Sequence, residues 1–425
     1  MKQLFTGLLL LLILGGNGLF AQKQKCGTDI LKAKKIAENP ELAKEYARLN
    51  KLEASYQRPE REMKGGGPAI LTIPTVVHVL YNSSEENISD QQIYNQILAL
   101  NEDFRLNNSD SLQPNHPFWL YTADSGLEFC LAQQDPNGNP TNGITRTFTQ
   151  RTSFTNYEDE KYTSEGGKDN WDPTRYLNIW VCNLGEDGLL GYATPPASMS
   201  AFPEEDGVVI DYRAFGFGGT AGSPPFEDNA LGRTGVHEVG HWLNLDHIWG
   251  DDFCGDDFVD DTPPAEDANY GCSSFPLNPN NSCGSDQNGE MYMNYMDYSD
   301  DYCLVMFTFD QVDRMYSAIE NGRPGLVTSR GCTAASIQER NFNYGLQVYP
   351  NPVQQVLFLQ STKELDAVGL EITVHDPMGR QISVDKNGFD EMGVISLNTE
   401  EWATGLYYIV VKSNLGKEVF KVSKN

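Results

Sequence analysis

His237-Glu238-Val239-Gly240-His241-Trp242-Leu243-Asn244-Leu245-Asp246-His247 contains three of the six histidines of this 425-residue chain. Residues four apart share one face of a helix, so His237 and His241 can point two imidazoles at one metal ion. Glu238 then lies beside the ion, where a general base for a metal-activated water is needed. The stretch therefore predicts a zinc site with its own base. The alternative is a chance grouping of ordinary core or surface histidines.

The third histidine requires a turn. His247 cannot lie on the same straight helix face, so the chain must leave the helix near Asn244, a residue that tolerates the left-handed conformation. The resulting pattern, HExxHxxNxxH, resembles the extended zinc signature of the metzincin metallopeptidases, with Asn where those enzymes usually carry Gly. The resemblance implies that His237, His241 and His247 bind Zn²⁺ and that Glu238 takes a proton from the attacking water.

A second segment, Asn294 to Asp301, resembles the methionine-containing turn that metzincins place beneath the zinc. In that role Met296 is an apolar cushion and not a ligand. Tyr298 matches a tyrosine that the pappalysin branch is thought to use to hold the oxyanion. The alternative is that both are ordinary core and surface residues. A closing helix is expected over Phe307 to Ile319, with Thr308 and Gln311 at capping-box spacing.

The eight cysteines form an even set outside the N-terminal leader, as an oxidising compartment allows. The pappalysin resemblance implies two disulfides, Cys254 with Cys283 and Cys272 with Cys303. Cys130 and Cys182 lie in apolar runs and are either buried thiols or a pair; the partner of Cys332 is likewise open.

The N-terminal region has the organisation of a secreted zymogen. Residues 1–21 carry Lys2 and then an apolar run, which is typical of a cleaved signal peptide. Residues 22–67 are polar, with Lys- and Arg-rich helical stretches and a Gly-rich end, and predict a propeptide. Cys26-Gly27-Thr28 resembles a cysteine switch, in which a thiolate caps the zinc. The alternatives for Cys26 are a disulfide or an idle thiol.

An acidic segment follows the third histidine. Acidic residues crowd positions 251–267, and their mutual repulsion in a short cross-linked loop favours a bound hard cation with oxygen ligands. Pappalysin-type enzymes bind calcium in this region, so we expect a structural Ca²⁺ site, although a solvated acidic run is the simpler alternative. The candidate ligands are Asp256, Asp257, Asp260 and Thr262.

Asp301 is the candidate for substrate specificity. In metzincins the chain leaving the methionine turn lines the pocket for the side chain after the cleaved bond. A carboxylate there would pair with a guanidinium or ammonium, and some bacterial pappalysin-like enzymes prefer Arg or Lys at this position. Asp301 would otherwise be one more solvated acid.

The expected fold is an α+β metzincin catalytic domain, residues 68–332, followed by a linker, 333–346, and a small all-β, Ig-like sandwich, 347–425. Strands are expected at 71–80, 177–184 and 207–212, with a helix over 90–104 that Ser89 opens with Gln92. In the last segment, strands are expected near 357–359, 370–374 and 406–411. Its Tyr349-Pro350-Asn351-Pro352 opening resembles the C-terminal sorting domain of Bacteroidetes type IX secretion cargo; an Ig-like adhesion or carbohydrate-binding module is the alternative.

The formal net charge of −28 argues against nucleic acid or an anionic membrane as a partner. The prediction is a secreted or cell-surface zinc endopeptidase that is exported through the periplasm, contacts the outer-membrane secretion machinery through its C-terminal domain, and acts on proteins or peptides. Two alternatives stay open at this point. One is an adhesin or binding protein that retains a zinc fold without catalysis, and the other is a zinc hydrolase of another bond.

Overall fold

The computed structural model describes residues 25–54, 56, 70–333, 346–361, 371–376, 380–382, 394–413 and 416–425. It divides into two compact units, residues 1–334 and 335–425, each with its own hydrophobic core. The boundary falls in the expected linker. The expected signal peptide and the Gly-rich end of the expected propeptide lie outside the described residues. None of the helices described is long and apolar enough to cross a membrane.

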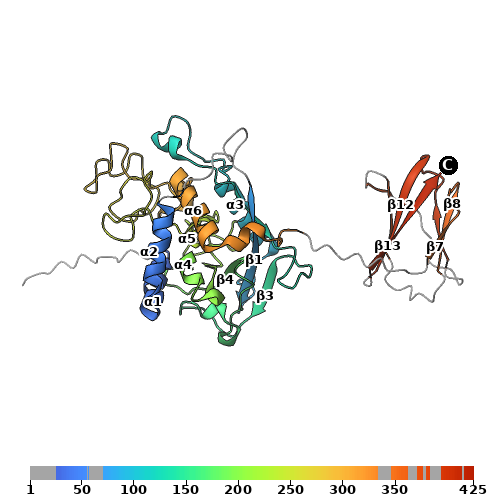
Figure 1. Cartoon of the computed structure of the whole chain (residues 1–425), viewed down its shortest axis with the longest axis horizontal. Helices are drawn as coiled ribbons and strands as arrows, with labels where there is room; N and C mark the ends of the chain where they lie inside the picture. Colours follow the sequence, from blue (N-terminus) through green and yellow to red (C-terminus); the bar gives the residue numbers. More distant parts are fainter. Residues whose placement is uncertain are drawn as a thin grey trace, which may run out of the picture. The chain divides into compact units, whose positions relative to one another are not determined.

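The first unit is built on one mixed sheet (Figure 1). Its strands are β1 (Leu71–Tyr81), β2 (Leu127–Leu131), β3 (Ile144–Phe148), β4 (Leu177–Cys182), β5 (Gly191–Ala193) and β6 (Val208–Asp211). The order is β2-β1-β4-β6-β5, and β3 pairs with the second half of β1. All pairs are parallel except β5 with β6, so β5 is an antiparallel edge strand. The strands expected from the β-branched runs are present within a few residues of their predicted ends.

Strand β1 is buried on both faces, which explains its nearly continuous apolar sequence. Ile73, Val77 and Val79 point into the main core, which also contains Val236 and Val239 of the histidine motif, whereas Val76 and Leu80 belong to clusters on the opposite face. Leu31, which comes from the N-terminal segment, packs into one of those opposite clusters. The N-terminal segment is therefore part of the packed unit.

The helices of this unit are α1 (Thr28–Glu38), α2 (Leu42–Glu53), α3 (Asp90–Phe104), α4 (Pro196–Met199), α5 (Arg233–Trp242) and α6 (Phe309–Gly322). Short 3₁₀ helices lie at η2 (Pro117–Tyr121), η3 (Asp159–Lys161), η4 (Thr163–Glu165), η5 (Pro203–Glu205), η6 (Asp301–Cys303) and η7 (Pro324–Thr328). Ser89 caps α3 as predicted. The prediction of a full capping box is wrong there, because the Gln92 side chain does not bond back to Ser89. It donates instead to the carbonyls of Tyr212 and Phe215. At α6 the box of Thr308 and Gln311 is complete.

Three disulfides cross-link this unit. Two have the pairing that the resemblance implied, Cys254 with Cys283 and Cys272 with Cys303, and the third joins Cys130 to Cys332. Cys182 and Cys26 are buried free thiols. The open question about Cys130 is thus answered by a link from β2 to the end of the unit, which closes a loop of 202 residues.

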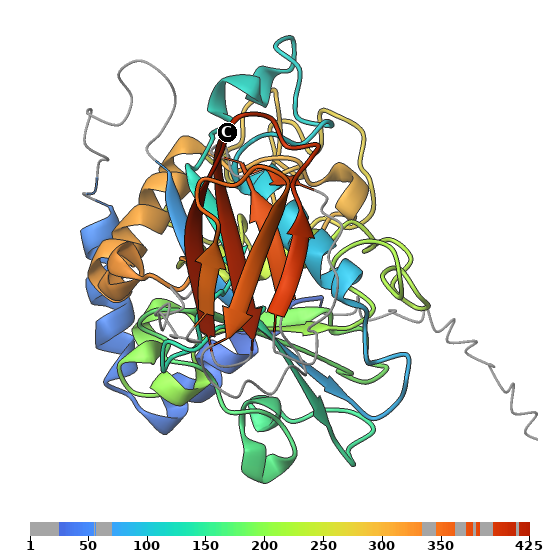
Figure 2. The same ribbon diagram turned by 90° about the vertical axis from the view of Figure 1, so that its right-hand side faces the viewer.

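The second unit consists of two small antiparallel sheets (Figures 1 and 2). One has the order β10-β9-β12-β13, and the other has the order β11-β8-β7. The strands are β7 (Leu346–Tyr349), β8 (Val356–Ser361), β9 (Glu371–His375), β10 (Gln381–Ile382), β11 (Val394–Asn398), β12 (Gly405–Ser413) and β13 (Gly416–Lys424). Side chains from both sheets, among them Leu357, Leu359, Ile409 and Val411, share one core. This is the expected β-sandwich.

Candidate active site

Helix α5 and the loop after it bring the three histidines of the motif together. The Nε2 atoms of His237, His241 and His247 lie 3.1–3.2 Å from one another, and all three side chains are buried. Four ligands around zinc, at bonds of about 2.0–2.1 Å, place ligand nitrogens about 3.3 Å apart. The three nitrogens therefore converge as a tetrahedral metal site requires.

The other ring nitrogen of each histidine has its own partner. The Nδ1 atoms of His237 and His241 donate to the carbonyls of Tyr295 and Leu245, both at 2.7 Å. His247 Nδ1 lies 2.5 Å from the Asp251 carboxylate. Burial and neighbouring imidazoles lower the pKa of His237, and of His241 to about 3, so both are neutral. These bonds fix the tautomers that leave Nε2 free for a metal.

Two backbone features shape the helix end. Asn244 has φ +71°, which confirms the predicted left-handed turn that returns the chain toward His247. Gly240, in the middle of α5, has Met296 directly above it. A Cβ on Gly240 would lie 2.5 Å from Met296 Sδ, so only glycine lets the methionine turn approach the helix. Met296 is completely buried.

The N-terminal segment covers the histidines. Cys26 forms a parallel bridge with Gly191, and the Leu190 N–H and Gly191 carbonyl bond to Lys25 and Gly27. The segment thus extends the sheet beyond its edge strand β5. This pairing carries Cys26 Sγ to within 4.8 Å of one ring nitrogen of each histidine.

Glu238 lies in the same pocket as His237 and contacts this segment. Its Oε2 accepts bonds from Cys26 Sγ at 3.4 Å and Thr28 Oγ1 at 3.3 Å. Burial raises the pKa of Glu238 to about 8. A Cβ on Gly191 would lie 3.0 Å from the Glu238 side chain, so β5 approaches this carboxyl as closely as its backbone allows.

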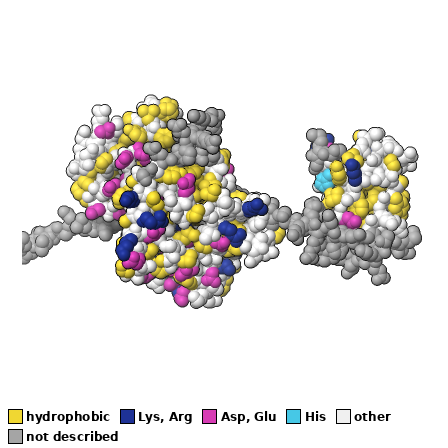
Figure 3. Space-filling view, viewed as in Figure 1, with side chains coloured by type: hydrophobic (Ala, Val, Ile, Leu, Met, Phe, Trp, Pro, Cys, Tyr) yellow, Lys and Arg dark blue, Asp and Glu magenta, His cyan; other side chains and the backbone are white. Residues whose placement is uncertain are grey.

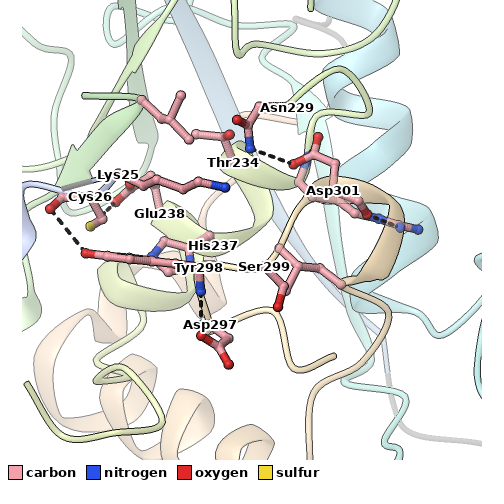
Figure 4. A pocket seen from close by; sticks show the side chains of 13 residues that line it. Lys25, Cys26, Asn229, Thr234, His237, Glu238, Asp297, Tyr298, Ser299 and Asp301 are labelled. Atoms are coloured by element: carbon pink, nitrogen blue, oxygen red, sulfur yellow. Dashed lines mark hydrogen bonds between the residues drawn. The ribbon is translucent and has the colours of Figure 1, made fainter. Parts of the chain in front are cut away.

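Aromatic rings form the wall beside His247. Trp249 stacks on the imidazole, with ring centroids 4.3 Å apart, and the Tyr298 ring lies edge-on to it at 4.9 Å. The Tyr298 hydroxyl donates to the Cys26 carbonyl at 3.3 Å (Figure 4). Tyr298 is therefore at the site, held by the N-terminal segment.

The residues present fit zinc. Three imidazoles and one thiol make a four-membered donor set of the kind that zinc prefers. Burial, and then the Glu238 carboxylate, raise the pKa of Cys26 to about 12, so a cation at the histidines is needed to stabilise the thiolate.

Asp301 lines the pocket next to His237 and Glu238, yet it is only 1% exposed. Its Oδ2 accepts the backbone N–H groups of Leu231 and Arg233, and its Oδ1 accepts from Asn229 Nδ2 at 3.4 Å. Burial raises its pKa despite these bonds. Asp301 is therefore not a solvated surface acid, which was the alternative interpretation. Its bonds to Leu231 and Arg233 also hold the start of helix α5.

The four candidate calcium ligands are only partly assembled. Asp257 is buried, accepts from Thr262 Oγ1 at 2.7 Å, and has its pKa raised to about 7 by burial. Asp256 and Asp260 are exposed. Within the described ranges, the histidine, cysteine and carboxylate groups close enough to share an ion lie around His247, and Asp256, Asp257 and Asp260 are not among them.

Sequence reasoning missed several residues of the site. Asp251 follows His247 by four residues, a helix-like spacing that offered a signal. Asp29 also reaches His247 Nδ1, at 3.2 Å, and Lys25 lines the pocket mouth. No local pattern marks Asp29 or Lys25, because their roles depend on the N-terminal segment folding back over the site.

Comparison with known proteins gives consistent matches. Residues 160–320 match the peptidase M43 family model, described as pregnancy-associated plasma protein-A, and residues 347–425 match the secretion system C-terminal sorting domain. An extracellular metalloprotease of Pyricularia oryzae is 32% identical over 60% of this chain and 77% of its own length.

Solved structures agree. Mature mirolysin of Tannerella forsythia with a cleaved peptide is 49% identical, with TM-score 0.57, over 61% of this chain and 96% of its own length. A promirolysin mutant is 42% identical, with TM-score 0.61, over 73% and 98%. The mixed sheet, the zinc helix and these matches define a metzincin metallopeptidase with a catalytic zinc.

The chain belongs to the pappalysin family, the family of pregnancy-associated plasma protein-A. It is a metalloendopeptidase that is secreted or held at the cell surface, and its second unit is a secretion sorting domain. The alternatives of a noncatalytic adhesin, of a hydrolase for another bond and of an adhesion module at the C-terminus are therefore set aside. The proform match supports a zymogen.

Proposed function

We propose that the chain is a latent endopeptidase in which Glu238 is the general base and the segment from Lys25 to Thr28 blocks the site. The observation that carries the proposal is the position of Cys26, which lies over three converging histidine nitrogens and in hydrogen-bond contact with Glu238. When bound by His237, His241 and His247, zinc polarises the water and the peptide carbonyl and lowers the pKa of the water.

Each remaining step is assigned to a side chain. With Cys26 and Thr28 withdrawn, the Glu238 carboxylate is free to accept the proton of the attacking water and to return it to the leaving amine. Tyr298, released from the Cys26 carbonyl, is free to donate its hydroxyl to the developing oxyanion. The edge-strand groups of Leu190 and Gly191, now bonded to the segment, become available for the substrate backbone.

Glu238→Ala tests the mechanism. In chains freed of the propeptide by an added protease, the variant should keep one zinc per chain, measured by elemental analysis. Hydrolysis of a denatured protein should fall by about 10² to 10⁴ or more, because general-base catalysis alone supplies that factor. Glu238→Gln serves as the shape-conserving control and should fall similarly. Full activity in zinc-loaded Glu238→Ala would contradict the assignment.

Asp301 is proposed as the acid that favours Arg or Lys after the cleaved bond. Support comes from its place in the pocket beside Glu238 and from its burial, which strengthens a charge pair. Its three protein hydrogen bonds leave acceptor capacity for a further donor. Residues 58–64, which contain Arg58, Arg61 and Lys64, would then be sites of self-processing.

A structural Ca²⁺ ion in the acidic loop is proposed with Asp257 as its central ligand, because this buried carboxylate has a raised pKa that a cation would relieve. A chelator selective for calcium should lower the melting temperature, and Asp256→Asn with Asp257→Asn should abolish that difference. Asp286→Asn, at an exposed acid of a neighbouring loop, is the control. Superimposable melting curves with and without calcium would refute the proposed calcium site.

A further inference from the structure

Lys25 places a positive charge at the mouth of the active-site pocket. It is the residue before Cys26, and its side chain extends across the pocket from the Cys26 end toward the Asp301 end (Figure 4). Its Nζ does not contact Asp301. It lies 3.2 Å from Oδ1 of Asp300, and the two side chains are only 20% and 19% exposed.

Asp300 differs from Asp301 in its partners. Asp301 is held by two backbone N–H groups and by Asn229, so much of its charge is compensated within the protein. Among the described residues, the partner of the Asp300 carboxylate is Lys25 alone. Removal of the N-terminal segment therefore leaves Asp300 as a half-buried carboxylate without a cation.

A second cavity adjoins this carboxylate. Its volume is about 270 Å³, enough for several water molecules at about 30 Å³ each, and so for a long side chain. Asp228 and Asp300 supply its acidic groups, while Phe226, Leu190 and Tyr270 supply apolar walls that suit the methylene stem of lysine or arginine. Lys25, Leu190 and Asn229 line both this cavity and the pocket of Asp301, so the two are adjacent.

We propose that Asp300, with Asp228, forms a second acidic subsite that binds a lysine or arginine side chain of the substrate next to the residue bound at Asp301. Lys25 occupies this subsite in the latent chain, as an internal stand-in for the substrate. The inference rests on the proposed peptidase function and extends it from one basic residue to a pair of them after the cleaved bond.

The test uses mature enzyme and quenched peptides with Arg fixed directly after the cleaved bond. The next position carries Lys, Arg, Glu or norleucine, the last being an uncharged analogue of the lysine stem. Wild type should favour Lys over norleucine about fivefold in kcat/KM, as expected for a partly screened ion pair. Asp300→Asn should bring this ratio near one, and Asp300→Lys should favour Glu.

Glu227→Gln is the matched control, because it removes an exposed charge nearby that lines neither cavity, and it should keep the wild-type ratio. In the full chain, Lys25→Met and Asp300→Asn should each shorten the activation lag, and the double variant should add little. A wild-type ratio near one, or an unchanged ratio in Asp300→Asn, overturns the subsite. Absence of any peptide cleavage by zinc-loaded wild type would instead refute the proposed function.

Discussion

At the scale of single residues, the site depends on the absence of a side chain. Gly240 lies mid-helix, where glycine costs about 1 kcal/mol relative to alanine. Glycine is nevertheless required at this position, because Met296 occupies the space that a Cβ would need. The methionine turn, whose Tyr295 carbonyl holds His237, is thereby seated against the helix.

Gly240→Ala should therefore destabilise the protein, although it improves helix propensity. Overpacking of a buried contact costs about 1–3 kcal/mol, which exceeds the propensity gain over most of that range. We expect a lower melting temperature and weaker zinc binding, measured by competition with a chromogenic chelator. Adding Met296→Ala should recover part of the zinc affinity. A Gly240→Ala protein that is more stable than wild type would show that the turn yields easily.

At the scale of elements, the two N-terminal helices, α1 and α2, hold the N-terminal segment in place through contacts that lie further along the chain than Cys26. Lys and Arg side chains gather over α1 and α2, interleaved with acidic ones (Figure 3). On the buried side, Lys35 of α1 enters an acidic group, in which it bonds Glu205 and lies 3.9 Å from Glu158. Glu53 of α2 pairs with Arg314 at 2.9 Å. Both of its carboxylate oxygens lie 2.8 Å from Asn244 Nδ2, which donates to them.

The acidic group around Lys35 also contains a third buried glutamate. Glu160 is fully buried in the same group, and burial and then Glu158 raise its pKa to about 7. Lys161 pairs with the neighbouring Glu158 at 2.8 Å, and Lys35, whose own pKa burial lowers, is the second lysine of this group. The Lys35 ammonium therefore stabilises the docked helix through charge as well as packing.

Latency should thus depend on two separate contacts. Lys35→Ala leaves buried carboxylates without their partner, which costs about 3–5 kcal/mol. Cys26→Ala removes the cap over the histidines. Both should shorten the lag before activity appears in the full chain, by about tenfold or more for Lys35→Ala. Lys34→Ala, at the exposed neighbouring position, should keep the wild-type lag. Wild-type lags in both Lys35→Ala and Cys26→Ala would show that neither contact maintains latency.

At the scale of the whole molecule, catalysis and export belong to different units. The first unit holds the zinc site, the three disulfides and the N-terminal helices, and the second has an independent core of two sheets. Because the cores are separate, each unit should unfold on its own.

A chain ending at residue 334 should keep the melting transition of the first unit and, after activation, its peptidase activity. It should fail to reach the cell surface, since residues 347–425 are the sorting domain. Calorimetry of both chains and fractionation of producing cells measure the two effects. Loss of the first transition in the shortened chain would mean that the units depend on one another.

Local patterns in the sequence determined much of the site. The four-residue spacing of His237 and His241, the turn at Asn244 and the caps at Ser89 and Thr308 depend on contacts within a few residues, so they can be predicted without the fold. The resemblance to the pappalysins supplied the methionine turn and two disulfide pairings.

Only the tertiary structure decided the rest, because the contacts join residues far apart in the chain. Lys25 meets Asp300 across 275 positions, and Cys130 meets Cys332 across 202. Gly240 is constrained by Met296 and not by its own helix. Asp301 was predicted from its place after the turn, but its burial and its bonds to the start of the zinc helix arise from packing. Local propensity is set by neighbours in sequence, whereas burial and charge pairing are set by neighbours in space.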